Sequence, residues 1–260
     1  MDLGIKGKNA LVTGGTRGLG LAAVTSLAKE GVNVIYCARN QESLDETSKL
    51  MGKLGAKHSG LKVEITNDEK KLKEFFLLAE SKFGEIDILI NNVGGSLGSG
   101  SLINDTLENY EKVFDINFWA SLKLMKIAIQ KMSEKKWGRI INISSIFGRE
   151  YGGKSSSYMA SKASLIASTK HLAIECASKG ITVNSIAPGS IKHMGGSWEK
   201  FVNLNEKSVV DEFISNNLPM GKFGSPEPVG DMVAFLSSKL AFTVTGTCIN
   251  IDGGQGSSLI

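Results

Sequence analysis

Short apolar segments rich in β-branched residues alternate with longer segments of helical periodicity along this chain. Seven short segments are expected to form strands, at residues 9–14, 32–38, 60–65, 86–91, 139–144, 181–187 and 246–252. Each is almost continuously apolar, as is typical of strands that helices cover on both faces of a parallel sheet. Strands that alternate with helices form repeated βαβ units. The sequence therefore predicts a doubly wound, seven-stranded parallel α/β sheet.

Helical periodicity predicts helices over residues 18–29, 70–82, 109–135 and 155–179. The first two are expected to be amphipathic crossover helices. The other two are the longest, and we expect them to pack on the sheet and on partner subunits. Residues 189–223 interrupt the β/α rhythm, and we interpret them as a substrate-binding lobe within a single domain of residues 1–260.

The composition restricts the class of protein. A chain of 260 residues with 42% hydrophobic and 22% charged residues can bury a full core. The net charge of +4 is small, and acidic and basic residues are interspersed, so no nucleic-acid partner is predicted. No apolar run approaches the roughly 20 residues that span a bilayer. The start lacks a signal pattern, and the three cysteines are far apart. We expect a cytoplasmic protein that does not bind membranes.

A glycine-rich turn, TGGTRGLG, directly follows the first expected strand and places Gly14, Gly18 and Gly20 where the next helix opens. Glycines let the backbone approach a pyrophosphate, and the helix N-terminus offers free N–H groups and the positive end of the helix dipole. The spacing of these glycines differs from the G-x-G-x-x-G pattern. The alternative is that the glycines only allow the chain to turn from the strand into the helix. The functional interpretation is a dinucleotide-binding site.

Two arginines specify which dinucleotide is expected. Arg17 lies inside the glycine turn, and Arg39 follows the second expected strand. NAD sites usually place a carboxylate at the end of that strand, whereas the 2′-phosphate of NADP favours a guanidinium. No acid stands directly beside Arg39, so the pair favours NADP(H).

Tyr158 and Lys162 are four positions apart in a segment of helical pattern and are expected to share one face. An ammonium beside a phenol should lower the phenol pKa from about 10 toward the range useful for proton transfer. A carbonyl that accepts a hydride develops charge on its oxygen, and Ser145, at the end of the fifth expected strand, is the natural second donor. A Tyr and a Lys at this spacing are often only a surface pair. The motifs around Tyr158 and Lys162 favour a catalytic role.

These motifs together resemble the short-chain dehydrogenase/reductase family along essentially the whole chain. The residues that carry the resemblance are TGGTRGLG, NNVG from Asn91 to Gly94, Asn117 in DINFW, Ser145, Tyr158, Lys162, PGSI from Pro188, and INIDGG near the end. The resemblance implies a Rossmann fold and carbonyl–alcohol oxidoreduction with a nicotinamide cofactor.

The resemblance also implies residue roles. Tyr158 would be the general acid, Ser145 would orient the carbonyl, Lys162 would bind the nicotinamide ribose and lower the Tyr158 pKa, and Asn117 would support a proton-relay water. The expected NADP(H)-binding residues are Gly14, Thr16, Arg17, Gly18, Leu19, Gly20, Arg39, Asn91, Gly94, Tyr158, Lys162, Pro188, Gly189 and Ile191. The histidines and cysteines show no metal-ligand spacing, so no metal site is expected.

The chain departs from the family pattern at several positions. Glu64 stands where the family commonly has an aspartate near the adenine ring, and Val93 replaces an alanine. His193 occupies the region of a threonine that usually bonds the carboxamide. In the longer segment that follows, four apolar residues are either a substrate lid or the lobe's own core: Ile191, Met194, Trp198 and Phe201.

Within the family, the sequence is similar to bacterial 3-oxoacyl-[acyl-carrier-protein] reductases. This resemblance implies reduction of a 3-oxoacyl thioester of carrier protein or CoA, and a homotetramer. Acidic carrier protein would dock on basic residues near the site, for which Lys136 and Lys179 are candidates.

Three other functions stay open. A ketone, sugar or polyol dehydrogenase would share the same catalytic residues. A phosphate-loop NTPase is suggested by GREYGGKS, residues 148–155, which matches G-x-x-x-x-G-K-S. A nucleotide-binding protein without turnover is disfavoured by the intact catalytic set.

Overall fold

The computed structural model describes residues 1–153 and 155–259. Its strands form one seven-stranded parallel sheet in the order β3-β2-β1-β4-β5-β6-β7. The bounds are β1 Asn9–Val12, β2 Asn33–Ala38, β3 His58–Lys62, β4 Ile88–Asn91, β5 Gly138–Ile143, β6 Ile181–Pro188 and β7 Cys248–Ile251. The predicted doubly wound sheet is confirmed. β3 begins two residues before the predicted segment at position 60.

Helices connect the strands of the sheet. Their bounds are α1 Gly18–Lys29, α2 Gln41–Lys53, α3 Glu69–Phe83, α4 Leu107–Phe114, α5 Ala120–Glu134, α6 Ser156–Cys176, α7 Ser197–Leu204, α8 Lys207–Asn217 and α9 Glu227–Ser237. Of these, α2, α7, α8 and α9 are additional to the predicted helices. Within residues 1–153 and 155–259, every helix is too short or too polar to cross a lipid bilayer.

The predicted helical segment of residues 109–135 is confirmed, since the chain is helical from Leu107 to Glu134, but the helix is not regular throughout. A π-helical turn, η1 at Asp115–Trp119, separates α4 from α5. At its centre the Asn117 side chain donates to the Val113 carbonyl at 2.8 Å. A side-chain amide that bonds a helix carbonyl competes with the regular backbone ladder, and such bulges occur often at functional sites.

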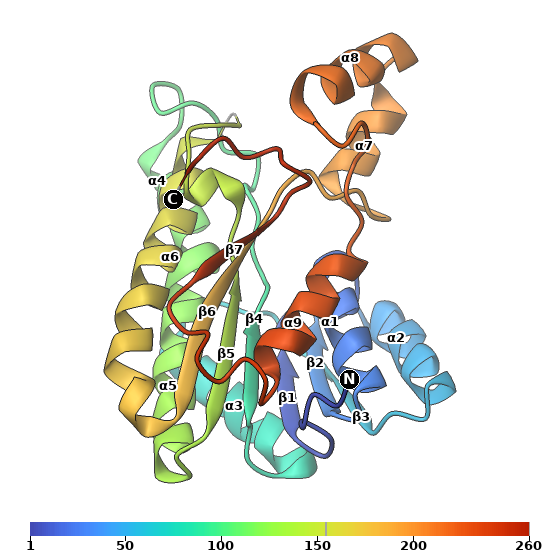
Figure 1. The fold of residues 1–260 in the computed structure, drawn as a ribbon. Coiled ribbons are helices and arrows are strands. Elements are labelled where there is room, and N and C mark those ends of the chain that lie inside the picture. Colours follow the sequence, from blue (N-terminus) through green and yellow to red (C-terminus); the bar gives the residue numbers. More distant parts are fainter. Residues whose placement is uncertain (154, 260) are drawn as a thin grey trace.

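Two apolar layers cover the sheet, and strand residues alternate between them. Leu11 and Ile35 pack with α3, α5 and α6, whereas Ala10 and Val34 pack with α1, α2 and α9. Figure 1 shows these two groups of helices on opposite sides of the strands. The nearly continuous apolar strands in the sequence follow from this burial on both faces.

The strand order reverses between β1 and β4, and all seven strands run in the same direction. The segments that follow β1, β4, β5 and β6 therefore meet at one end of the sheet, the position where ligands bind in doubly wound folds. In Figure 1, α7, α8 and the C-terminus lie at this upper end.

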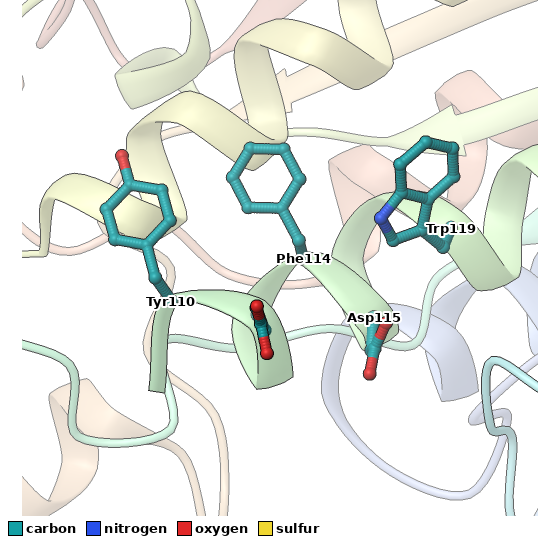
Figure 2. A pocket seen from close by; sticks show the side chains of 5 residues that line it. Tyr110, Phe114, Asp115 and Trp119 are labelled. Carbon is teal, nitrogen blue, oxygen red and sulfur yellow. The ribbon is translucent and has the colours of Figure 1, made fainter. Parts of the chain in front are cut away.

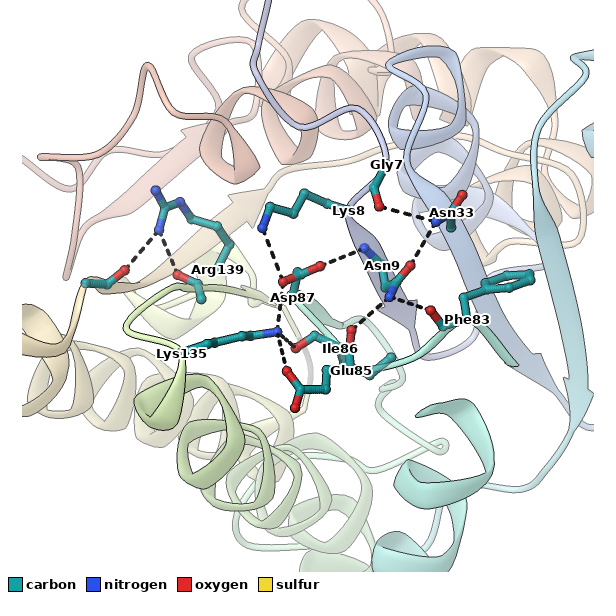
Figure 3. Close-up of polar contacts among 12 residues, drawn as sticks. Gly7, Lys8, Asn9, Asn33, Phe83, Glu85, Ile86, Asp87, Lys135 and Arg139 are labelled. Carbon is teal, nitrogen blue, oxygen red and sulfur yellow. Dashed lines mark hydrogen bonds and ion pairs between the residues drawn. The ribbon is translucent and has the colours of Figure 1, made fainter. Parts of the chain in front are cut away.

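Polar contacts tie the opposite, amino end of the sheet around Asp87 (Figure 3). Its carboxylate accepts from the Asn9 backbone N–H at 3.0 Å and pairs with Lys135 at 2.8 Å and Lys8 at 3.4 Å. The Asn9 amide donates to the carbonyls of Phe83 and Glu85, at 3.0 Å each. These bonds join β1 and β4 to the end of α5.

Candidate active site

The glycine turn brings α1 against the end of β1. Gly14 has a φ of +67°, which L side chains rarely adopt. A Cβ on Gly20 would collide with the Gly14 carbonyl oxygen. The N-cap residue Arg17 is extended and makes no side-chain capping bond. The N-terminus of α1 is thus close to the turn and free of a side-chain cap, which suits an anionic group such as a pyrophosphate.

Two residues that sequence reasoning missed hold this turn. The Asn92 side chain donates to the carbonyls of Thr13 and Gly14, at 2.9 and 3.1 Å. The Thr13 hydroxyl accepts from the backbone N–H groups of Asn92 and Val93, at 2.9 and 3.2 Å. Their position directly after β1 and β4, the strands at the reversal of strand order, is the sequence feature that could have identified them.

Asn91 is buried under the site, with 2% of its surface exposed. Its amide donates to Asn142 at 2.9 Å, and Asn142 donates to Thr169 at 2.8 Å. The Asn91 side-chain oxygen is buried without a hydrogen-bond partner. A contact of Asn91 with a cofactor stays a prediction.

Asn117 is fully buried and clamps the loop that follows β4. Its side-chain oxygen accepts from the Gly95 N–H at 3.0 Å, and its amide donates to the Gly95 carbonyl at 2.8 Å. A Cβ on Gly94 would lie 2.5 Å from the Asn117 side-chain oxygen and 3.1 Å from the Lys162 Nζ. Asn117, Gly94 and Lys162 are thus in one place. The relay role of Asn117 stays a prediction.

Ser145 and Tyr158 form the centre of the site. Ser145 follows β5 after Ser144, and its hydroxyl accepts from the Phe147 N–H at 3.2 Å. Ser155 caps α6 by accepting from the Tyr158 N–H at 3.2 Å, which fixes the start of that helix. The Ser145 side chain lies close enough to Tyr158 to act on the pKa of its phenol, and both residues line one cavity. The two hydroxyls predicted to bind a carbonyl oxygen are therefore adjacent.

The expectation of a lowered tyrosine pKa is wrong for this structure. Burial raises the Tyr158 pKa, and the Ser145 side chain only partly opposes it. Lys162 lies 5.6 Å from the centre of the Tyr158 ring. Its ammonium donates to the Ile143 carbonyl at 2.8 Å. Because desolvation acts on both groups, it also lowers the Lys162 pKa to about 8.

A cavity of about 330 Å³ opens beside these hydroxyls. Ser145 and Tyr158 line it together with Phe147, Gly152 and Gly153, and Pro188, Gly189 and Ser190 line it from the end of β6. Trp198, from α7, lines it as well. The predicted residues Ser145, Tyr158, Pro188 and Gly189 thus share one cavity, whereas Ile191 is buried and pairs with Gly224.

The phosphate-loop pattern of residues 148–155 belongs to this same cavity. Gly152, Gly153 and Ser155 line it beside Tyr158. Lys154, the lysine of the pattern, lies outside the described residues.

The segment after Gly189 reaches both the cofactor turn and the cavity. A Cβ on Gly18 would lie 2.7 Å from the His193 ring, so this histidine packs against the glycine turn. Trp198 packs on Phe213 and Phe223, with ring centres 4.8 and 5.4 Å apart. Phe201 joins this cluster, whereas Met194 is 81% exposed. The aromatic residues therefore form a core of the lobe, and Trp198 also faces the cavity.

At the expected adenosine end, Arg39 pairs with Glu64 at 3.4 Å, and both side chains are exposed. Arg17 is exposed as well. The guanidinium predicted to bind a 2′-phosphate thus already has a carboxylate partner.

The expectation that Lys136 and Lys179 lie near the site is wrong within one chain. They immediately precede Trp137–Gly138 at the start of β5 and Gly180–Ile181 at the start of β6. The hydroxyls of Ser145 and Tyr158 lie beyond the other ends of the strands, so the sheet separates the two groups.

A second hollow, of about 350 Å³, lies on α4 and η1. Figure 2 shows the rings of Tyr110, Phe114 and Trp119 projecting to the same side of this segment. Tyr110 stacks on Phe114 at 5.7 Å, and Trp119 is 42% exposed.

Comparisons with known proteins agree with this site. A family model described as Enoyl-(Acyl carrier protein) reductase matches residues 14–255. The chain is 38% identical over 259 residues to the 3-oxoacyl-[acyl-carrier-protein] reductase FabG of Rickettsia conorii, covering 96% of this chain and 98% of that protein. It is 33% identical over 253 residues to the FabG of Escherichia coli, covering 97% and 99% of the two chains.

Among solved structures, a variant of the actinorhodin polyketide ketoreductase with NADPH is similar, with a TM-score of 0.89 and 30% identity. The similarity covers 97% of this chain and 98% of that one.

Proposed function

Because the chain belongs to the short-chain dehydrogenase/reductase family, we propose that it uses NADP(H) to reduce the carbonyl of a 3-oxoacyl thioester to a secondary alcohol. The observation that carries the proposal is that Ser145 and Tyr158 lie close together on the wall of one cavity. The names of the FabG relatives support the acyl substrate, and the ketoreductase with NADPH supports the cofactor.

The residues present fit a nicotinamide dinucleotide. The uncapped start of α1 suits its pyrophosphate, and Arg17 and Arg39 suit a 2′-phosphate. The Lys162 ammonium lies beside Gly94, where it can bind ribose hydroxyls. The bound cofactor would supply a hydride to the carbonyl carbon.

The protein supplies the proton and stabilises the charge on oxygen. Ser145 and Tyr158 donate hydrogen bonds to the carbonyl oxygen as the C–O double bond becomes single. Tyr158 then transfers its phenolic proton to that oxygen, and the phenolate regains a proton from solvent. The raised Tyr158 pKa keeps the phenol protonated at neutral pH, so the site is suited to reduction.

The assembly is part of the same proposal. We place the enzyme in the cytoplasm as a homotetramer, with the aromatic hollow of α4 and η1 in a subunit contact. The lobe of residues 189–223 would cover the substrate. Since Lys136 and Lys179 lie at the amino end of the sheet, a carrier protein docked on them would serve the site of another copy.

The test follows NADPH and NADH oxidation with an acetoacetyl thioester. We expect faster turnover with NADPH and a loss of about 10²–10⁴-fold in kcat in Tyr158→Phe, with NADPH affinity kept. Tyr151→Phe is the matched control, because Tyr151 lies in the loop before α6 and is 91% exposed.

Three results would contradict parts of the proposal. Reduction of only small ketones or sugars would overturn the acyl substrate. Equal activity in Tyr158→Phe would overturn the proton donor. Failure to bind either nucleotide would overturn the reductase function itself.

A further inference from the structure

The C-terminal segment crosses the catalytic end of the sheet and contacts both walls of the cavity. We call residues 252–258 the C-terminal strap. In Figure 1 the chain passes from β7 over the upper end of the sheet toward α4 and α6. The two walls are the segment from Phe147 to Gly153 and the segment from Pro188 to Ser190, which follow β5 and β6.

Glu150 binds the strap to the first wall. One oxygen of its carboxylate accepts from the Ser257 N–H at 2.6 Å, the Ser257 hydroxyl at 3.1 Å and the Ser258 N–H at 2.7 Å. Hydrogen bonds to an ionised acceptor are stronger than neutral ones. Next to it, Arg149 donates to the Cys248 carbonyl at 3.1 Å and to the Asn250 side chain. Consecutive residues of this wall thus hold β7 and the strap.

Gln255 binds the strap to the second wall. Its side-chain oxygen accepts from the Ser190 N–H at 2.7 Å. The Gly189 backbone approaches so closely that a Cβ there would lie 2.7 Å from the same oxygen and 2.7 Å from the Asp252 Cβ. Ser190 and Gly189 both line the cavity.

Asp252 fixes the shape of the strap between these two contacts. Its carboxylate accepts from the Gly254 and Gly256 N–H groups, at 3.0 Å each, and from the Asn250 amide at 3.2 Å. Residues 252–256 therefore form an internally bonded turn. A displacement of either wall would have to break bonds within the turn or at its ends.

We propose that the strap sets the distance between the two walls, with Glu150 and Gln255 as positioning residues. This inference rests on the proposed function, because the wall of Pro188–Ser190 contains two of the expected NADP(H)-binding residues and lines the same cavity as the proposed proton donor Tyr158. A hydride donor and a proton donor must reach the same carbonyl, and small misplacements of reacting groups reduce rates strongly. Glu150 and Gln255 are separate from Ser145 and Tyr158, whose hydroxyls are proposed to bind the carbonyl oxygen.

The first test compares Gln255→Leu, which removes the acceptor for the Ser190 N–H, with Gln255→Glu, which keeps one. We expect kcat/KM to fall at least about tenfold in Gln255→Leu, with most of it restored in Gln255→Glu. One hydrogen bond contributes about 1 kcal/mol, so Tm should change by only a few degrees. Glu175→Ala, which removes an exposed acid on α6, should change neither quantity.

A double-mutant cycle tests whether the strap acts as one unit. If Glu150 and Gln255 both act by holding the walls together, adding Glu150→Ala to Gln255→Leu should lower kcat/KM much less than Glu150→Ala alone does. Fully additive losses would overturn the strap as a unit. If Glu150→Ala and Gln255→Leu lower Tm but not kcat/KM, both residues have only a structural role.

Hydrogen exchange separates this inference from the proposed function, because it needs no substrate. In Gln255→Leu, we expect faster exchange of the Ser190 amide and also of amides at 147–153, on the other wall. Faster exchange at Ser190 alone would overturn the coupling. If the wild-type protein reduces no 3-oxoacyl thioester, the proposed function fails. The exchange pattern then still tests whether the strap couples the two walls.

Discussion

At the scale of single residues, burial controls the charge of the catalytic groups more than their proximity does. Tyr158 and Lys162 share a helix face, but the ammonium bonds the Ile143 carbonyl. Desolvation disfavours the charged form of each group. Burial therefore keeps the Tyr158 phenol neutral, as the proposed proton donor requires, and Lys162 loses its proton more readily than an exposed lysine.

The lowered Lys162 pKa should appear as a pH dependence of stability. Between the folded pKa of about 8 and the ordinary value of 10.5, the unfolded chain binds more protons than the folded one. The free energy of unfolding therefore rises with pH across this window, and below it the penalty of the buried ammonium stays constant. Urea unfolding from pH 7 to 10 should show the wild type gaining stability relative to Lys162→Met. A difference independent of pH would contradict this.

Glu64 should weaken the binding of NADPH, because it pairs with Arg39 at 3.4 Å. We expect Glu64→Gln to tighten NADPH binding about twofold to fivefold, since exposed ion pairs contribute only up to about 1 kcal/mol. Fluorescence titration with NADPH measures the effect, and NADH, which lacks the 2′-phosphate, is the control. Weaker NADPH binding in the variant would instead mean that Glu64 itself contacts the dinucleotide.

At the scale of elements, irregular segments position the site. The π-turn η1 places Asn117 so that it holds Gly95 through two hydrogen bonds. Gly94 is then so close to Asn117 and Lys162 that no side chain fits there. The loop after β4 thus takes its shape from a bulge in the helix that follows it.

Gly94→Ala should therefore disturb both the fold and the site. Its Cβ would lie 2.5 Å from the Asn117 side-chain oxygen, and such overpacking costs about 1–3 kcal/mol. We expect a lower Tm together with a lower kcat/KM. Gly95→Ala is the matched control for stability, because its Cβ meets nothing within 4 Å. Equal Tm values for the two variants would argue against the clamp.

At the scale of the whole molecule, the two ends of the sheet perform different tasks. The catalytic hydroxyls, the glycine turn and the strap lie at the carboxyl end, whereas the Asp87 contacts tie the amino end (Figure 3). The length of the strands therefore separates the residues at the carboxyl end from the Asp87 contacts at the amino end. Stability and catalysis can therefore be perturbed independently.

Asp87→Ala should destabilise the protein without changing its chemistry. The substitution leaves the Asn9 N–H without its acceptor and removes one partner of the Lys135 ammonium, which keeps the Ile86 carbonyl. An unsatisfied buried donor costs about 1–3 kcal/mol. We expect a Tm lower by several degrees and an unchanged kcat/KM at a temperature where the variant is folded. Asp45→Ala is the control, because it removes an acid that is exposed on α2. A loss of kcat/KM in the folded variant would show that the two ends are coupled.

The sequence alone determined the parallel sheet and the local parts of the site. Apolar strands that are covered on both faces, a glycine turn after β1, and a Tyr and Lys four positions apart on α6 are all short-range patterns. Only the tertiary structure decided the direction of the pKa shifts, the position of Lys136 and Lys179 relative to the site, the break at η1, and the contacts of Thr13, Asn92, Glu150 and Gln255. These features depend on burial and on residues that are distant in sequence. Glu150 and Ser257 are 107 positions apart, and no periodicity in the chain encodes their contact.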